Sequence, residues 1–137
     1  MTGERFCEYI VEHDILQNLE PHEETRKLLT ELHDRNYNTV IISARGFHPD
    51  ADRVTRDWFA KYHLPFDELY ISHHGKRKID SVNEHENIVL TLDDNVQHCE
   101  DFIASGKPKH VFLYDMPWNR ESDITRVRSL NEIYNYI

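Results

Sequence analysis

No apolar run in this sequence approaches the roughly 18 residues that a membrane-spanning helix needs. The N-terminal residues lead into no apolar stretch of the kind found in secretory signals. The chain also has no internal repeat, low-complexity tract or evident linker. These absences predict a cytoplasmic protein without a membrane partner. A length of 137 residues then fits one domain, residues 1–137.

Cysteine and basic residues are also scarce. The 2 cysteines, Cys7 and Cys99, lie far apart in the sequence, and reduced thiols are favoured over a disulfide. Lys and Arg number 16 against 25 acidic residues, which gives a net charge of -9. Long-range attraction to nucleic-acid polymers or anionic membranes is therefore not expected. The only dense basic cluster is Lys76-Arg77-Lys78, where a local pocket could still receive a small anion.

The sequence does contain short apolar runs that alternate with segments of helical spacing. Strands are expected at residues 38–43, 67–71, 88–92 and 110–114, and the unbroken apolar character of 38–43 predicts burial on both faces. Helices are expected at 4–12, from Leu19-Glu20-Pro21, after Asp50 as N-cap, from Lys78, over 95–105, and after the capping box of Ser129. This order predicts an α/β fold, a Rossmann-like open parallel sheet flanked by helices.

Polar residues follow three of the apolar segments. Ser43 ends the first expected strand, Lys78 comes shortly after the second, and Asp93-Asp94 ends the third. Because the carboxyl ends of parallel strands meet in one crevice, these side chains are expected to converge there. A hydroxyl, an ammonium and two carboxylates are suited to a phosphate group and a divalent cation.

Asp93 and Asp94 form the candidate metal site. Two adjacent carboxylates after a buried strand are costly unless a charge neutralises them. Mg²⁺ would do so with oxygen ligands, waters and a substrate phosphate. The alternative is that Asp94 or Asn95 simply caps the helix expected at 95–105.

Ser43, Ala44 and Arg45 form the candidate phosphate loop, together with Lys78. The hydroxyl and free backbone N–H groups can bind phosphate oxygens, and Arg45 can add a forked contact. The alternatives are a serine that caps a turn and a solvated lysine. Lys76 is a second candidate for the cation that follows His73-His74.

Other hydrolytic chemistries have weak support. The pair His73-His74 could bind Zn²⁺ near Asp93, but no His-x-x-x-His or Cys-x-x-Cys pattern accompanies it. Asp50-Ala51-Asp52 falls on an expected helix and is interpreted as a solvated face. Ser43 with a histidine lacks the Gly-x-Ser-x-Gly elbow of a serine hydrolase.

In the order and spacing of these motifs, the chain resembles the haloacid-dehalogenase-like (HAD-like) phosphohydrolases, and most of all the 5'(3')-deoxyribonucleotidase-type nucleotidases. The resemblance covers about residues 5–137. The stretches that carry it are Leu19-Glu20-Pro21, Ile41-Ile42-Ser43-Ala44-Arg45-Gly46, Val54-Thr55-Arg56-Asp57-Trp58-Phe59, Ser72-His73-His74 with Lys78, Leu92-Asp93-Asp94-Asn95, Phe112-Leu113-Tyr114-Asp115-Met116-Pro117-Trp118-Asn119-Arg120, and the segment 126–133.

The resemblance implies a Mg²⁺-dependent phosphatase acting on a nucleoside monophosphate. Ser43, with Ala44 and Arg45, and Lys78 would hold the phosphate. Asp93 would be the direct metal ligand and Asp94 its supporting partner. Residues 1–20 would be a remnant of a cap helix.

The sequence departs from the family at one point. In the family the first strand ends in Asp-x-Asp, which supplies the nucleophile and the acid/base. Here the first aspartate, Asp14, follows no strand, so no catalytic carboxylate is assigned. The central first strand and most of the cap are expected to be missing. A second copy, another polypeptide or the chain's own N-terminus could complete the sheet, or the neighbouring strands could pair directly.

Three functions remain at this point. The first is a nucleotidase-like enzyme that is impaired or depends on a strand from elsewhere, with in-line attack by an aspartate. The second is a non-catalytic descendant that binds a nucleotide, a phosphate or a protein. The third, with the least support, is a metal hydrolase built on histidine and carboxylate.

Overall fold

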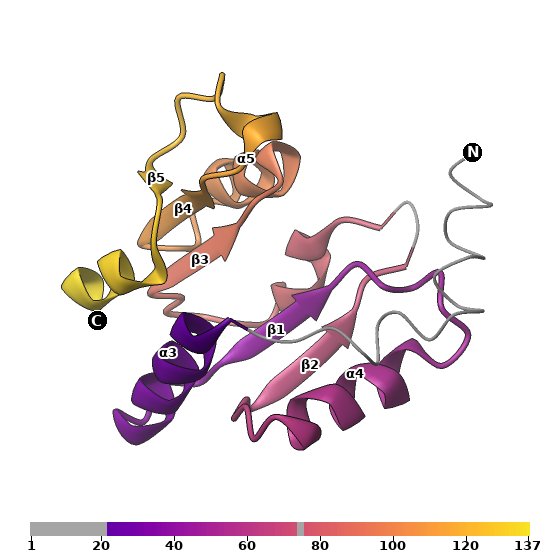
Figure 1. The fold of residues 1–137 in the computed structure, drawn as a ribbon. Coiled ribbons are helices and arrows are strands. Elements are labelled where there is room, and N and C mark those ends of the chain that lie inside the picture. Colours follow the sequence, from indigo (N-terminus) through magenta and orange to yellow (C-terminus); the bar gives the residue numbers. More distant parts are fainter. Residues whose placement is uncertain (1–21, 74–75) are drawn as a thin grey trace. The chain divides into compact units, whose positions relative to one another are not determined.

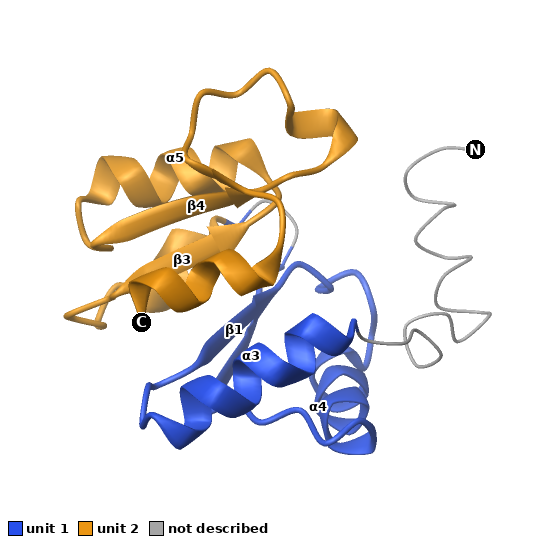
Figure 2. Cartoon of the chain, turned by 60° about the vertical axis from the view of Figure 1, so that its left-hand side comes forward, with its two compact units in different colours: residues 1–76 blue, residues 77–137 orange. Residues whose placement is uncertain are grey.

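A computed structural model describes residues 22–73 and 76–137 (Figure 1). The helix predicted at 4–12 and the helix start predicted at 19–21 lie outside the described residues, as does His74. The chain divides into two compact units, residues 1–76 and residues 77–137 (Figure 2). We call them unit 1 and unit 2.

Unit 1 contains two helices and two parallel strands. In chain order these are α3 (Glu23–Asp34), β1 (Val40–Ser43), α4 (Ala51–Lys61) and β2 (Glu68–Ile71). Ser43 pairs with Ile71, so the two strands end together. The core consists of Leu29, Phe59 and Leu64, with Ile41, Trp58, Tyr62 and Phe66 packed against it. Burial of these apolar side chains is the main term that stabilises the unit.

Unit 2 contains a three-stranded parallel sheet. Its elements are η1 (Lys78–Val82), β3 (Leu90–Asp93), α5 (Val96–Ser105), β4 (His110–Tyr114), η2 (Pro117–Asn119), β5 (Arg126–Val127) and η3 (Leu130–Tyr136). The strand order is β3-β4-β5. Leu113 of the central strand β4 is fully buried, and Cys99 and Ile133 are 1% exposed. Helix α5 ends at Gly106, whose φ of 66° is in the left-handed region typical of helix ends.

The predicted fold class is confirmed: the structure is α/β, with helices flanking open parallel sheets. The described strands pair as two sheets, β1-β2 and β3-β4-β5. The predicted burial of the first strand on both faces is wrong, because all four residues of β1 are only partly buried. The described part of the chain places a strand on just one side of β1, which explains this exposure.

Two further details differ from the sequence predictions. Asp50 is the N-cap of α4, but its side chain makes no capping hydrogen bond. It pairs instead with Arg53, at 3.3 Å. Strand β5 was not predicted, because two residues carry no periodic signal.

Candidate functional site

In unit 1, the loop that follows β1 packs against the loop that follows β2. The carbonyl of Ser43 accepts a hydrogen bond from the Ser72 N–H at 2.7 Å. A Cβ atom at Gly46 would lie 2.6 Å from the Cα of His73 and 2.8 Å from the carbonyl oxygen of Ser72. This approach requires glycine, since a side chain would force the two loops apart.

Arg45 lies in the same loop and has an incompletely paired guanidinium. Its Nη1 is buried and has no hydrogen-bond partner, and no ion pair joins it to another residue of the described ranges. The guanidinium lies 5.9 Å from the ring centroid of Trp58. Burial lowers the pKa of Arg45. A desolvated cation without a carboxylate is well suited to bind an anion.

In unit 2, Lys78 and Asp93 form a largely buried ion pair. Lys78 begins η1, and its Nζ donates to Oδ2 of Asp93 at 2.8 Å. The side chains are 16% and 9% exposed. The other oxygen of Asp93, Oδ1, accepts from the Asn95 N–H at 3.0 Å. Burial alone would raise the pKa of Asp93, but the hydrogen bond and charge of Lys78 outweigh it and hold that pKa low.

The carboxylate of Asp94 lies beside that of Asp93 and has the opposite shift. Burial raises the pKa of Asp94, and the neighbouring carboxylate of Asp93 raises it further. The helix cap is Asn95, whose side chain accepts from the His98 N–H at 3.1 Å, so the cap does not require Asp94. Two adjacent carboxylates, one with a raised pKa, fit a divalent cation that would relieve their repulsion.

Metal binding by protein ligands alone is not supported. The described residues contain no group of three or more histidine, cysteine, aspartate or glutamate side chains that could hold a metal ion. Mg²⁺ commonly uses one or two carboxylates together with waters and substrate phosphates. Asp93 and Asp94 therefore fit a Mg²⁺ site of this kind better than the zinc site considered for His73.

Two ion pairs that were not predicted from the sequence support this cluster. Arg77, next to Lys78, bonds to Asp101 on α5 at 3.0 Å, and Gln97 donates to Asp101 at 3.1 Å. Asp101 was detectable in principle, since it is a carboxylate between the buried Cys99 and Phe102 on an apolar helix face. Arg77 thus ties the segment before Lys78 to the helix that follows Asp94.

The second ion pair joins Arg126 of β5 to Asp115. Nη1 of Arg126 donates to Oδ1 of Asp115 at 2.9 Å and to Oδ1 of Asn119 at 2.7 Å. Asn119 in turn donates to the carbonyl oxygen of Asp94 at 2.9 Å. No sequence pattern points to these contacts, because β5 is too short to be predicted. They fix the loop after β4 to the loop after β3.

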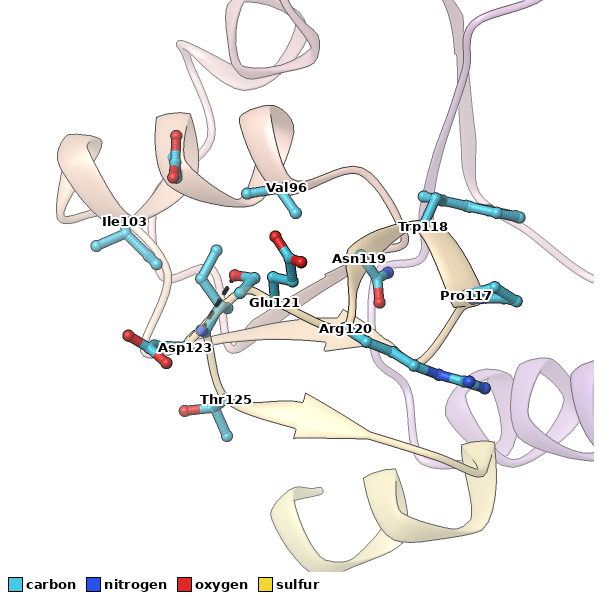
Figure 3. Close-up of a pocket in the computed structure, with 12 residues that line it drawn as sticks. Val96, Ile103, Pro117, Trp118, Asn119, Arg120, Glu121, Asp123 and Thr125 are labelled. Carbon is cyan, nitrogen blue, oxygen red and sulfur yellow. Dashed lines mark hydrogen bonds between the residues drawn. The ribbon is translucent and has the colours of Figure 1, made fainter.

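An open groove also occurs in unit 2, between α5 and residues 117–125 (Figure 3). Val96 and Ile103 line it from α5, and Asn119, Glu121 and Asp123 line it from the segment that follows β4. None of the site residues predicted from the sequence lines this groove. The structure thus places Ser43 at the end of β1 and Ala44 and Arg45 in the loop that follows it, and it brings Lys78, Asp93 and Asp94 together in unit 2.

Comparison with known proteins gives one match. Neither the curated proteins nor the solved structures contain a significant relative. Among the described residues, no helix combines the length and apolar character required to cross a membrane. One family model covers residues 1–137, that of the 5' nucleotidase, deoxy (Pyrimidine), cytosolic type C proteins. The resemblance to nucleotidases is confirmed, and the chain belongs to this family of HAD-like phosphohydrolases.

Proposed function

We propose that this chain provides the phosphate- and Mg²⁺-binding residues of a cytoplasmic nucleoside monophosphate phosphohydrolase. The observation that carries the proposal is the buried Nη1 of Arg45, which has no partner in the described part of the chain. A buried guanidinium nitrogen without an acceptor costs free energy in the free protein. A bound phosphate oxygen would remove that cost, because arginine binds phosphate with two parallel hydrogen bonds.

In this proposal each unit has its own task. The hydroxyl of Ser43 and the backbone N–H groups of Ala44 and Arg45 are the phosphate-binding groups of unit 1, and the ammonium of Lys78 is the phosphate-binding cation of unit 2. When bound, Mg²⁺ would polarise the phosphate as a Lewis acid. Contacts favour Asp94 as its direct ligand, with Asp93 as support, because both oxygens of Asp93 already accept hydrogen bonds. This assignment reverses the roles that the family resemblance implied for the two aspartates.

The attacking carboxylate has no candidate among the described strand ends. Asp115 follows β4, but it is paired with Arg126. In the described part of the chain, β1 pairs only with β2 and β3 pairs only with β4. Each strand thus has an edge open to a further strand. We propose that a strand outside the described residues, from this or another polypeptide, supplies the nucleophile.

Binding tests the role of Arg45. Inorganic phosphate, titrated by calorimetry, is expected to bind the wild-type chain and to lose at least 10-fold in affinity in Arg45→Met. Arg53→Met is the matched control, since Arg53 is an exposed arginine of the same unit, paired with Asp50 and Asp57. Equal affinity in the wild type and Arg45→Met would contradict the proposal.

Turnover separates the enzyme from the non-catalytic alternative. The chain is incubated with Mg²⁺ and nucleoside monophosphates, alone and with a synthetic strand peptide that ends in Asp-x-Asp. Because covalent catalysis needs its nucleophile, turnover is expected only with the peptide, and Asp94→Asn should abolish it. Phosphate or nucleotide binding without turnover under both conditions would favour the non-catalytic descendant.

A further inference from the structure

Asn119 is a buried amide with every hydrogen-bonding position in use. It is 2% exposed. Its Nδ2 donates to the carbonyl oxygens of Asp94, at 2.9 Å, and Tyr114, at 2.7 Å. Its Oδ1 accepts from the Met116 N–H at 3.1 Å and from Arg126 Nη1 at 2.7 Å. An amide offers two donors and two lone pairs, so no capacity is left for another role.

One of these bonds ends on the peptide group between Asp94 and Asn95. The carbonyl of that group accepts from Asn119, and its N–H donates to Oδ1 of Asp93 at 3.0 Å. A peptide group is planar, so the direction of its carbonyl fixes the direction of its N–H. A donor on the carbonyl also polarises the group and strengthens its N–H as a donor.

We propose that Asn119 is a positioning residue that acts on the Asp93 carboxylate through this single peptide group. It fixes the donor that holds Oδ1, while Lys78 holds Oδ2 at 2.8 Å. The carboxylate is thereby held on both oxygens, and the backbone of Asp94 is fixed at the same time. The consequence for metal binding rests on the proposed function, whereas the hydrogen bonds that hold the Asp93 carboxylate are independent of it.

Arg126 makes Asn119 rigid enough for this task. Its Nη2 donates to the Asn119 carbonyl oxygen at 2.9 Å, in addition to the Nη1 bond to Oδ1. The guanidinium is anchored by Asp115 at 2.9 Å. Neighbouring side chains in the same turn extend away from it, and Trp118 is 68% exposed (Figure 3). Asn119 is therefore the one residue of η2 built into the network.

The test removes the donor and keeps the acceptors. Asn119→Asp retains oxygens for Arg126 and for the Met116 N–H but cannot donate to the Asp94 carbonyl. Hydrogen exchange by NMR is expected to be about 10-fold faster at the Asn95 amide. The Leu113 amide, which donates to Thr125 in the core sheet, should be unchanged. Asn135→Asp, the same charge change at an exposed position of unit 2, is the control.

Two outcomes of that experiment overturn the proposal. An unchanged exchange rate at the Asn95 amide would show that Asn119 does not act on Asp93 through the Asp94–Asn95 peptide group. Equal acceleration at Asn95 and Leu113 would indicate that Asn119 only stabilises the unit. If Asn119→Asp does not fold, the proposal is tested on the wild-type chain by the exchange rates of side-chain carboxamide protons. Those of Asn119 should exchange more slowly than those of Asn135, and equal rates would contradict the proposal.

A metal titration keeps the two proposals separate. Mg²⁺ affinity, measured by calorimetry, is expected to fall about 10-fold in Asn119→Asp and to stay unchanged in Asn135→Asp. A wild-type chain that does not bind Mg²⁺ would overturn the proposed metal site, while the exchange rate of Asn95 would still test Asn119. A wild-type chain that binds Mg²⁺ with the same affinity as Asn119→Asp would overturn the effect of Asn119 on the site.

Discussion

Arg45 in unit 1 and Lys78 in unit 2 are the two cations expected to bind phosphate, and the protein neutralises them differently. Lys78 donates to Asp93 at 2.8 Å, and Arg77 beside it is paired with Asp101 at 3.0 Å. Arg45 has a buried nitrogen with no partner among residues 22–73 and 76–137, and its guanidinium lies over the ring of Trp58. Lys78 of unit 2 is therefore neutralised before any ligand binds, whereas Arg45 of unit 1 has no carboxylate partner among the described residues.

The caps of the α-helices follow the same division. In unit 2, Asn95 caps α5 and Ser129 caps η3 through their side chains. In unit 1, neither His22 before α3 nor Asp50 before α4 makes a side-chain capping bond. The difference indicates that unit 2 holds its own groups in place without a ligand, and that a bound anion would stabilise unit 1 by pairing with Arg45.

The largest expected effect is the loss of the buried ion pair. Lys78→Met leaves the Asp93 carboxylate without its cation and should lower the free energy of unfolding by about 3 kcal/mol. Arg45→Met removes a cation that has no counter-ion in the described part of the chain, and it should change the free energy of unfolding by less than about 0.5 kcal/mol. Urea denaturation measures both.

A double variant identifies the cause of the Lys78 effect. Lys78→Met combined with Asp93→Asn removes both charges and should recover most of the lost stability. If the double variant is as unstable as Lys78→Met, the loss does not come from an unpaired carboxylate. If Arg45→Met costs as much as Lys78→Met, the contrast between the units is wrong.

Two glycines give the next comparison. Gly46→Ala in unit 1 places a methyl group 2.6 Å from the Cα of His73, and we expect a loss of about 2 kcal/mol with a displaced phosphate loop. Gly106→Ala in unit 2 meets no atom within 4 Å but must adopt a φ of 66°, a strain of about 1 kcal/mol. The midpoints of thermal unfolding of the two variants measure which loses more stability. Only Gly46→Ala should also weaken phosphate binding in calorimetry.

Replacing the N-cap residues of α5 and α4 should reduce the stability by a smaller amount. Asn95→Ala removes the acceptor of the His98 N–H and should cost about 1 kcal/mol. Asp50→Ala removes only an exposed ion pair with Arg53 and should cost at most about 0.3 kcal/mol. Thermal unfolding of the two variants provides the comparison. A larger loss from Asp50→Ala than from Asn95→Ala would contradict it.

The sequence predicted features that depend on neighbouring residues, and it did not predict contacts between residues far apart in the chain. Local patterns located β4 at residues 110–114, the helix end at Gly106 and the capping box of Ser129, because they depend on neighbouring residues. The bonds of Asn119 to Asp94 and Arg126 join loops after different strands. A single sequence carries no signal for such contacts.

The same limit applies to exposure and to the site. The sequence indicated that residues 38–43 form a strand, but their burial depends on how many strands lie beside it, which composition does not determine. Convergence at strand ends placed Lys78 near Asp93 in the sequence prediction, and in the structure the two side chains form a hydrogen bond. A common position for these residues and Ser43 stays a prediction.

The smallest expected effect is a pH dependence that belongs to the capping box of unit 2. The N–H groups of Arg128 and Ser129 donate to the Glu132 carboxylate and lower its pKa. A folded-state pKa below the unfolded value means that Glu132 stabilises the fold above its ordinary pKa. This contribution is lost as the pH falls through the lower folded-state value. Between pH 6 and pH 3, wild-type stability should therefore fall slightly more than that of Glu132→Gln, which keeps an acceptor but no titratable group. Parallel curves from urea denaturation would show that the cap does not depend on the charge of Glu132.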